Sequence, residues 1–249
     1  VVADEVVADE VVADEVVADE VVADEVIVDE KAAGEVVAGE VVADEIIEDE
    51  KVDVDMNFLL QNRVHYGRKT KTRFSESFIY KVHPRGFFLI DLTITIEKLK
   101  SAAKFMANYK PEKILICSAR EYAVNGINKM CELTGMSAKA GRFLPGTLTN
   151  HILKGYQQAD LILVVDHNYD SQAVQEAVKM KIPVISFVDT NSFPSLVDFT
   201  IPANSKGRVS LAALFWSLTV LYLREKNILA FDEIIDVPLD DFIVPLYDE

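Results

Sequence analysis

From Phe87 onward, short apolar runs alternate with amphipathic helical patterns, and this alternation constrains the fold more than any other feature of the chain. Strands are predicted over residues 87–91, 113–117, 161–165 and 184–188. Helices are predicted between the first two strands and around residues 121–134 and 171–181. Continuous apolar strands separated by amphipathic helices favour a parallel sheet that is covered on both faces. The expected fold is therefore α/β, with a doubly wound, Rossmann-like, mostly parallel sheet.

A last helix is predicted over residues 206–226, and it is apolar nearly all round. We expect it to be buried on more than one side, with a protein neighbour covering part of it. The longest apolar stretch, residues 209–223, has 15 residues, fewer than the roughly 20 that cross a bilayer. The N-terminus is acidic where secretory signal peptides are basic. A soluble intracellular protein is expected, with Cys117 and Cys131 as buried free thiols.

Charge is sorted along the chain, so that the net charge of -16 conceals a basic central segment. Residues 1–55 carry 21 Asp/Glu against two Lys, and residues 231–249 carry seven Asp/Glu and no Lys or Arg. Residues 56–230 carry 23 Lys/Arg against 13 Asp/Glu, a net charge of +10. A basic domain attracts polyanions through charge neutralisation and counterion release. The sequence thus predicts a nucleic-acid-binding domain at 56–230 between an acidic N-terminal extension at 1–55 and an acidic C-terminal tail at 231–249.

The N-terminal extension consists of a five-residue repeat. Residues 1–25 are five identical copies of VVADE, and degenerate copies continue to Glu50. A period of five matches neither the helical period of about 3.6 nor the strand period of two, so no steady apolar face results. We expect this low-complexity extension to be disordered, with a pentapeptide-repeat solenoid as the alternative. Its role stays open between competing with nucleic acid, binding a basic neighbour and having no specific partner.

A basic loop, defined here as residues 68–73, is the first candidate phosphate contact. Arg68 is followed by Lys69, Lys71 and Arg73 at every second position. If the loop is extended, the alternating cations lie on one face about 6–7 Å apart, comparable with the phosphate spacing of a nucleic-acid strand. The loop therefore predicts contact with an RNA or DNA backbone, and an ordinary solvated loop is the alternative.

Two further segments are candidate anion sites. The segment GRFLPGTLTN at 141–150 contains two Gly, one Pro and several hydroxyl or amide side chains. Its exposed backbone N–H groups would meet an anion, unless the segment is only a structural turn. In the segment NSKGR at 204–208, Asn204 or Ser205 is predicted to cap a helix. Lys206 and Arg208 then add positive charge at the positive end of the helix dipole, which suggests a bound phosphate or else cations splayed into water.

An enzymatic alternative rests on Asp91, Asp166 and Asp189, which follow three predicted strands. Carboxylates at that edge of an open α/β sheet would hold Mg²⁺ for phosphoryl transfer, which defines an alternative Mg²⁺-dependent phosphotransferase. An Asp after a strand more commonly caps the following turn, and we favour that interpretation. The nucleotide-binding and hydrolase motifs GxGxxG, GxxxxGK[ST] and GxSxG are absent from the sequence.

A series of motifs runs through residues 58–225. These motifs are GRFLPGTLTN at 141–150, VHYG at 64–67, KTKT at 69–72, FIY at 78–80, residues 86–91, SAR at 118–120, SQA at 171–173, IP at 201–202 and NSKGR at 204–208. Together they resemble the ribosomal small-subunit protein two (S-two) family, of archaeal type, and GRFLPGTLTN is the most specific of them. Residues 123–126 and 166–170 depart from the family pattern, and the VVADE repeat has no counterpart in the family. The coiled-coil insertion of bacterial members is also absent from the sequence.

The resemblance implies a structural, non-enzymatic constituent of the small ribosomal subunit in the cytoplasm. The domain would bind small-subunit rRNA near the junction of head and body and support subunit assembly and translation. Its partners would be rRNA and neighbouring ribosomal proteins, with no membrane, no small-molecule substrate, no cofactor and no metal. The acidic C-terminal tail is expected to dock on a basic neighbour. A free acidic-tailed nucleic-acid chaperone remains a further alternative.

The predicted rRNA-binding residues come from the three segments above. Specificity is expected from RNA shape and 2′-hydroxyl groups more than from base edges. Phosphate contacts are assigned to Arg68, Lys69, Lys71, Arg73, Arg142, Lys206 and Arg208, with assistance from Thr147, Thr149 and Asn150.

Overall fold

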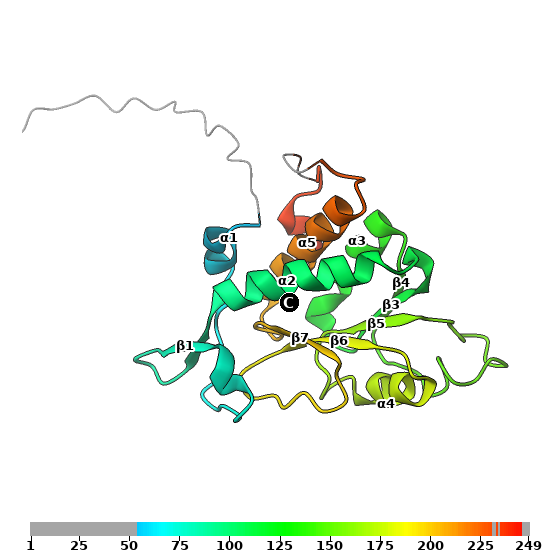
Figure 1. Ribbon diagram of the computed structural model, residues 1–249, viewed down its shortest axis with the longest axis horizontal. Helices are drawn as coiled ribbons and strands as arrows, with labels where there is room; N and C mark the ends of the chain where they lie inside the picture. The colour runs from blue at the N-terminus through cyan, green and yellow to red at the C-terminus, as the bar shows by residue number, and fades with distance from the viewer. Residues whose placement is uncertain (1–53, 231–232, 234, 246–249) are drawn as a thin grey trace, which may run out of the picture. The chain divides into compact units, whose positions relative to one another are not determined.

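The computed structural model describes residues 54–230, 233 and 235–245, and its centre is a five-stranded parallel sheet (Figure 1). The strand order is β4-β3-β5-β6-β7, and every neighbouring pair is parallel. The strands are β3 (Ile114–Ser118), β4 (Ser137–Ala140), β5 (Leu161–Val164), β6 (Val184–Val188) and β7 (Phe199–Pro202). The predicted α/β fold with a mostly parallel sheet is confirmed. The VVADE repeat lies outside the described residues.

Helices cover both faces of this sheet (Figure 1). Helices α2 (Leu92–Ala107), α3 (Val124–Thr134) and α5 (Arg208–Glu225) lie on one face, and α4 (Ser171–Met180) lies on the other. The strand residues alternate between two apolar clusters, because successive side chains of a strand point to opposite faces. Ile114 and Ile116 join the cluster of α2, α3 and α5, whereas Leu115 and Cys117 join the cluster of α4. The doubly wound arrangement is therefore present in the packing as well as in the strand order.

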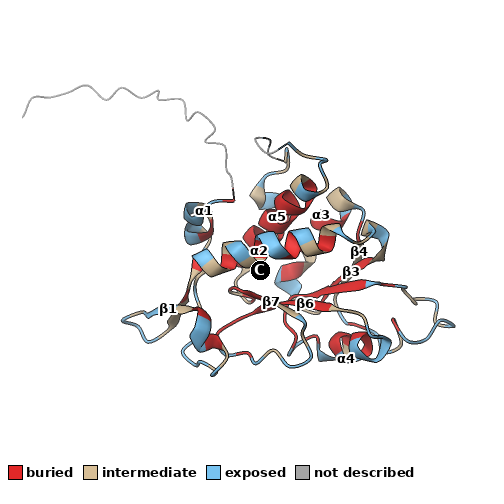
Figure 2. Cartoon of the chain, in the orientation of Figure 1, coloured by how far each residue is buried: buried red, intermediate tan, exposed pale blue. Residues whose placement is uncertain are grey.

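Helix α5 is the central helix of the domain. Every residue from Ser210 to Leu223 is buried, which confirms the prediction that this helix is covered on several sides (Figure 2). Its neighbours include α2, α3 and the short helix α1 (Met56–Gln61), whose Phe58 ring lies 5.0 Å from the Trp216 ring. No helix within the described residues is long and apolar enough to cross a membrane.

The described part of the acidic tail packs against this helical layer instead of extending away from it. Its 3-10 helix η4 (Leu239–Phe242) contacts α5 and α3, and Phe242 is fully buried. The Trp216 indole N–H donates to the carbonyl oxygen of Val237 at 3.2 Å. The Asn125 side chain donates to the carbonyl oxygen of Ile243 at 3.1 Å. The described apolar side chains of the tail, such as Leu239 and Phe242, therefore cover this chain's own domain, and docking of the tail on a basic neighbour stays a prediction.

The first predicted strand lies in a different sheet from the others. Strand β2 (Phe88–Ile90) pairs antiparallel with β1 (Ile79–Val82) in a separate two-stranded sheet that follows the 3-10 helix η1 (Ser75–Phe78). Ile90 and Phe78 form a small apolar cluster of their own with Val188. The remaining 3-10 helices are η2 (Pro111–Lys113) and η3 (Glu121–Ala123).

Candidate nucleic-acid interface

The carboxyl edge of the parallel sheet is the edge at which open α/β sheets usually bind ligands. The strand order reverses between β3 and β5, and such a switch point is the usual ligand site. Arg120 follows β3 and Asp166 follows β5, and the Arg120 guanidinium donates to an Asp166 carboxylate oxygen. The ring of Tyr169 lies 4.9 Å from the same guanidinium. The chain's own side chains therefore occupy the switch point.

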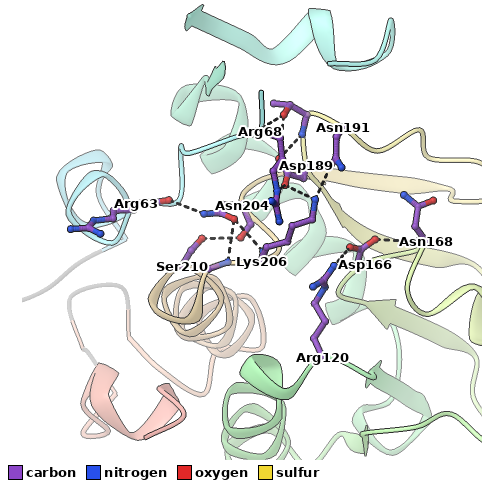
Figure 3. A network of polar contacts seen from close by, with 12 residues as sticks. Arg63, Arg68, Arg120, Asp166, Asn168, Asp189, Asn191, Asn204, Lys206 and Ser210 are labelled. Carbon is purple, nitrogen blue, oxygen red and sulfur yellow. Dashed lines mark hydrogen bonds and ion pairs between the residues drawn. The ribbon is translucent and has the colours of Figure 1, made fainter. Parts of the chain in front are cut away.

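A second ionic cluster surrounds Asp189, which follows β6 and is 1% exposed (Figure 3). Lys206 Nζ lies 3.1 Å and Arg68 Nε lies 3.7 Å from the carboxylate oxygen Oδ2. The Thr190 backbone N–H donates to the other oxygen at 2.6 Å. Lys206 Nζ also donates to Asn191 Oδ1 at 2.7 Å. This buried carboxylate thus neutralises part of the positive charge at the edge of the sheet.

The three aspartates of the phosphotransferase hypothesis do not form one site. Asp91 follows β2 in the antiparallel pair and caps α2, because its carboxylate accepts from the Thr93 backbone N–H at 2.9 Å. Asp166 pairs with Arg120, and Asp189 holds the cluster just described. Within the described residues, no group of three or more His, Cys, Asp or Glu side chains is placed to hold a metal ion. The hypothesis fails because each carboxylate has a separate structural partner.

The segment at 204–208 begins α5 differently from the prediction. The helix starts at Arg208, and the capping position is Gly207 without a side-chain cap. Asn204 Oδ1 instead accepts from the backbone N–H groups of Lys206 and Gly207 at 3.1 and 3.2 Å, which stabilises the turn before the helix. A Cβ at position 207 would lie 3.0 Å from Asn204 Nδ2, so this turn leaves little room for a side chain.

The two cations of that segment have internal partners. The Lys206 side chain is 15% exposed and is held by Asp189. Arg208 Nη1 donates to the carbonyl oxygen of Val244 at 2.7 Å, which ties the start of α5 to the described tail. Lys206 and Arg208 therefore each have a partner within the domain, which makes them less available to phosphate than the cations of the basic loop.

The loop at 141–150 already binds a carboxylate of its own chain. Glu176 on α4 is 2% exposed, and its oxygens accept from the backbone N–H groups of Gly146 at 2.7 Å and Leu148 at 3.1 Å. Burial alone would raise the pKa of Glu176, but these hydrogen bonds and one from Gln172 hold that pKa below its ordinary value. The predicted anion site exists as an internal contact, which fixes the loop on α4.

The side chains of this loop divide into buried and exposed ones. Thr147 is fully buried, and its hydroxyl donates to the carbonyl oxygen of Leu144 at 2.7 Å. It is therefore removed from the candidate RNA contacts. Arg142, Thr149 and Asn150 are exposed and remain candidates.

The basic loop presents all four of its predicted cations to solvent. It is not a strand, since it bends at Lys69 and begins a turn at Arg73, so the condition for evenly spaced cations on one face is not met. Thr72 anchors the loop by donating its backbone N–H to Thr190 O at 3.0 Å and its hydroxyl to Ser192 O at 3.2 Å. Lys71 Nζ lies 2.9 Å from Glu76.

Two of these cations are unopposed. Within the described part of the chain, Lys69 and Arg73 form no ion pair. The neighbouring hairpin of β1 and β2 was not predicted as part of the interface, although aromatic and basic residues are interspersed from Tyr80 to Phe88. Interspersed aromatic and basic residues are typical of surfaces that bind single-stranded nucleic acid. This pattern would have marked the hairpin as a second part of the candidate interface.

A switch point filled by the chain's own side chains, together with exposed cations that form no ion pair, defines an α/β protein suited to structural contact with a polyanion. The sequence model of the ribosomal protein S2 family matches residues 59–158 and 151–220. The small ribosomal subunit protein uS2 of Pyrobaculum aerophilum is 43% identical over 191 residues, which cover 76% of this chain and 92% of that relative. The uS2 proteins of Saccharolobus solfataricus and Nitrosopumilus maritimus are both 39% identical, over 76% and 77% of this chain and 82% and 92% of their own lengths. The chain belongs to the ribosomal protein S2 family.

This membership confirms the resemblance deduced from the motifs, including its archaeal type. It makes the chain a structural ribosomal protein and not an enzyme. The phosphotransferase alternative is therefore wrong on grounds of family as well as geometry.

Proposed function

We propose that this chain is built into the small ribosomal subunit, where its basic loop holds the sugar-phosphate backbone of rRNA. The relatives carry the name of small ribosomal subunit protein uS2, which supports the location in the subunit. The observation that carries the contact itself is the exposure of Lys69 and Arg73 without an internal ion pair. When unopposed cations of a protein meet phosphate groups, they displace the counterions that are condensed on the nucleic acid, and this release favours binding.

The proposed contact residues are a revised form of the predicted set. Phosphate contacts are assigned to the basic loop, and Arg142, Thr149 and Asn150 assist from the 141–150 loop. Lys206 and Arg208 act indirectly, since they hold Asp189 and the carbonyl group of Val244 in place. RNA would be selected by shape and by its 2′-hydroxyl groups. The proposed site in the cell is the cytoplasmic ribosome near the junction of head and body.

Gradient sedimentation of cell extracts tests this function. The triple variant Lys69→Glu, Lys71→Glu, Arg73→Glu is expected to sediment largely apart from small subunits, whereas the unaltered chain co-migrates with them. The matched control reverses three exposed lysines on helices α2 and α4, namely Lys100, Lys104 and Lys179. Recovery of the unaltered chain only at the top of the gradient would instead support a free nucleic-acid chaperone and refute the proposal.

A further inference from the structure

Aromatic and basic side chains line one open pocket of about 490 Å³ beside the basic loop. It lies where the start of this loop meets the hairpin of β1 and β2. Its size falls within the range of about 300–1,000 Å³ that is typical of small-ligand sites. The lining side chains used below are the aromatic Tyr66, His83 and Phe87 and the cationic Arg68, Lys69 and Arg85.

The aromatic rings of this pocket are held in place before any ligand arrives. The His83 ring stacks on the Phe87 ring with centroids 4.2 Å apart and an interplanar angle of 14°. The backbone N–H of His83 donates to Phe87 O at 2.8 Å, and that of Arg85 donates to His83 Nδ1 at 3.2 Å. The Tyr66 ring lies 5.2 Å from the Phe87 ring at an interplanar angle of 46°, and the residue Tyr66 is 38% exposed. Ordered rings lose little conformational entropy when another flat ring stacks on them.

The positive charge around the aromatic side chains determines which class of flat ligand the pocket favours. Three of the lining residues are cations and none is acidic. Lys69 forms no ion pair with any other described residue, and only Arg68 shares its charge with Asp189. A neutral aromatic ligand would not use these cations, and an acidic peptide would not use the stacked rings. A nucleotide within a single strand uses both, because its base stacks while the flanking phosphates meet the cations.

We propose that this pocket binds an unpaired base of single-stranded RNA, which stacks on the Tyr66 ring beside the His83–Phe87 pair. The proposal rests on the proposed function and deepens it, because it adds a base contact to the backbone contacts of the basic loop. Bases inside a duplex are already stacked and paired, so the pocket selects single-stranded loops, bulges or ends.

Binding of two charge-matched probes to the full chain tests the pocket. The first probe is single-stranded oligoadenylate of about ten nucleotides, within the site sizes of about 4–16 nucleotides seen for single-strand binders. The second is a ribose-phosphate oligomer of the same length without bases. Fluorescence anisotropy measures both affinities. The variant Tyr66→Leu is expected to bind oligoadenylate about 5- to 150-fold more weakly, equivalent to about 1–3 kcal/mol, and the base-free oligomer unchanged.

Three further variants separate stacking from charge and from folding. Tyr66→Phe keeps the ring and is expected to retain oligoadenylate binding. Tyr80→Leu alters a side chain that is 74% exposed on the same hairpin outside the pocket, and it is expected to change neither affinity. Arg85→Ala is expected to weaken both probes equally. If Tyr66→Leu does not fold, ultraviolet crosslinking of the unaltered chain to oligoadenylate replaces this variant as the test. Crosslinks within residues 66–69 or 83–87 support base binding in the pocket, and crosslinks elsewhere overturn it.

Three binding results refute base stacking in the pocket and leave the proposed function in place. The first is equal affinity of the unaltered chain for the two probes, and the second is an equal loss of both affinities in Tyr66→Leu. The third is failure of the unaltered chain to bind either probe. The proposed function has its own test in the sedimentation of the basic-loop variant, so the two proposals can fail separately.

Discussion

Replacing Phe242 by Ala tests whether the C-terminal segment belongs to the folded domain. Phe242 is fully buried in η4, which packs on α5 and α3. The segment around it is tied down by hydrogen bonds from Trp216, Asn125 and Arg208 to its backbone carbonyl groups. Phe242→Ala removes the largest apolar side chain of η4 and leaves these hydrogen bonds in place.

The magnitude follows from the buried area of the ring. A buried Phe removes roughly 150–250 Å² from water, which at about 25 cal/mol per Å² corresponds to about 4–6 kcal/mol. Residual burial in the unfolded chain lowers this figure by roughly 10–40%. Because η4 lies near a chain end and can relax around the change, we expect a loss of about 3 kcal/mol, at the lower end of the roughly 3–5 kcal/mol for core Phe→Ala changes.

Urea unfolding, followed by tryptophan fluorescence, measures this loss. Trp216 is the only tryptophan of the chain and reports directly on α5. The matched control is Phe193→Ala, since Phe193 is 62% exposed and its removal should change the unfolding free energy by less than about 0.5 kcal/mol. An equal effect of the two substitutions would refute the packing of the C-terminal segment on this domain.

Three further changes have effects of predictable sign. Asp189→Asn leaves two partly exposed cations without their carboxylate and should lower the unfolding free energy, measured in urea, by about 1–3 kcal/mol. This is less than the roughly 3–5 kcal/mol lost when a fully buried pair is broken, and an unchanged unfolding free energy would contradict the prediction. Burial raises the pKa of Asp170 from 3.8 to about 6, so the folded state binds a proton more readily and stability falls as the pH rises through this window. Asp170→Asn should flatten that part of the pH profile of the unfolding free energy, and a profile that keeps its slope would argue against the assignment. Gly126→Ala places a Cβ 2.6 Å from the Phe215 ring, and the destabilisation by crowding of about 1–3 kcal/mol should exceed the stabilisation by helix propensity of about 1 kcal/mol. The melting temperature should therefore fall, and a higher melting temperature would contradict this prediction.

The sequence predicts the interior of the fold well because burial leaves a direct mark on composition. Apart from Lys113 and Ser186, the runs at 113–117, 161–165 and 184–188 are apolar, since both faces of β3, β5 and β6 are covered. The strands β4 and β7 escaped prediction because they lie at the two edges of the sheet. Strand β4 reads Ser-Ala-Lys-Ala, and β7 ends in Pro202, which an edge strand tolerates. The run at 87–91 was recognised as a strand, but its antiparallel partner depends on contacts that no local pattern reveals.

The candidate site was only partly predictable, for a related reason. Exposure of the basic loop follows from its composition, and Lys69 and Arg73 are exposed, whereas their contact with RNA stays a prediction. The partner of Lys206 is Asp189, 17 positions earlier on another element, and the partner of Arg208 is the carbonyl group of Val244. Such pairings are set by the packed fold. Sequence spacing cannot tell a cation that faces solvent from one that already has a partner within the fold.

The salt dependence of binding to small-subunit rRNA tests the central claim most directly. Each phosphate contact contributes about 0.7–0.9 to the slope of log affinity against log salt concentration. The variant Lys69→Glu, Lys71→Glu, Arg73→Glu should therefore lower the magnitude of the slope by about 2–3, while the control Lys100→Glu, Lys104→Glu, Lys179→Glu keeps the slope of the unaltered chain. A basic-loop variant that keeps the full slope would contradict the account.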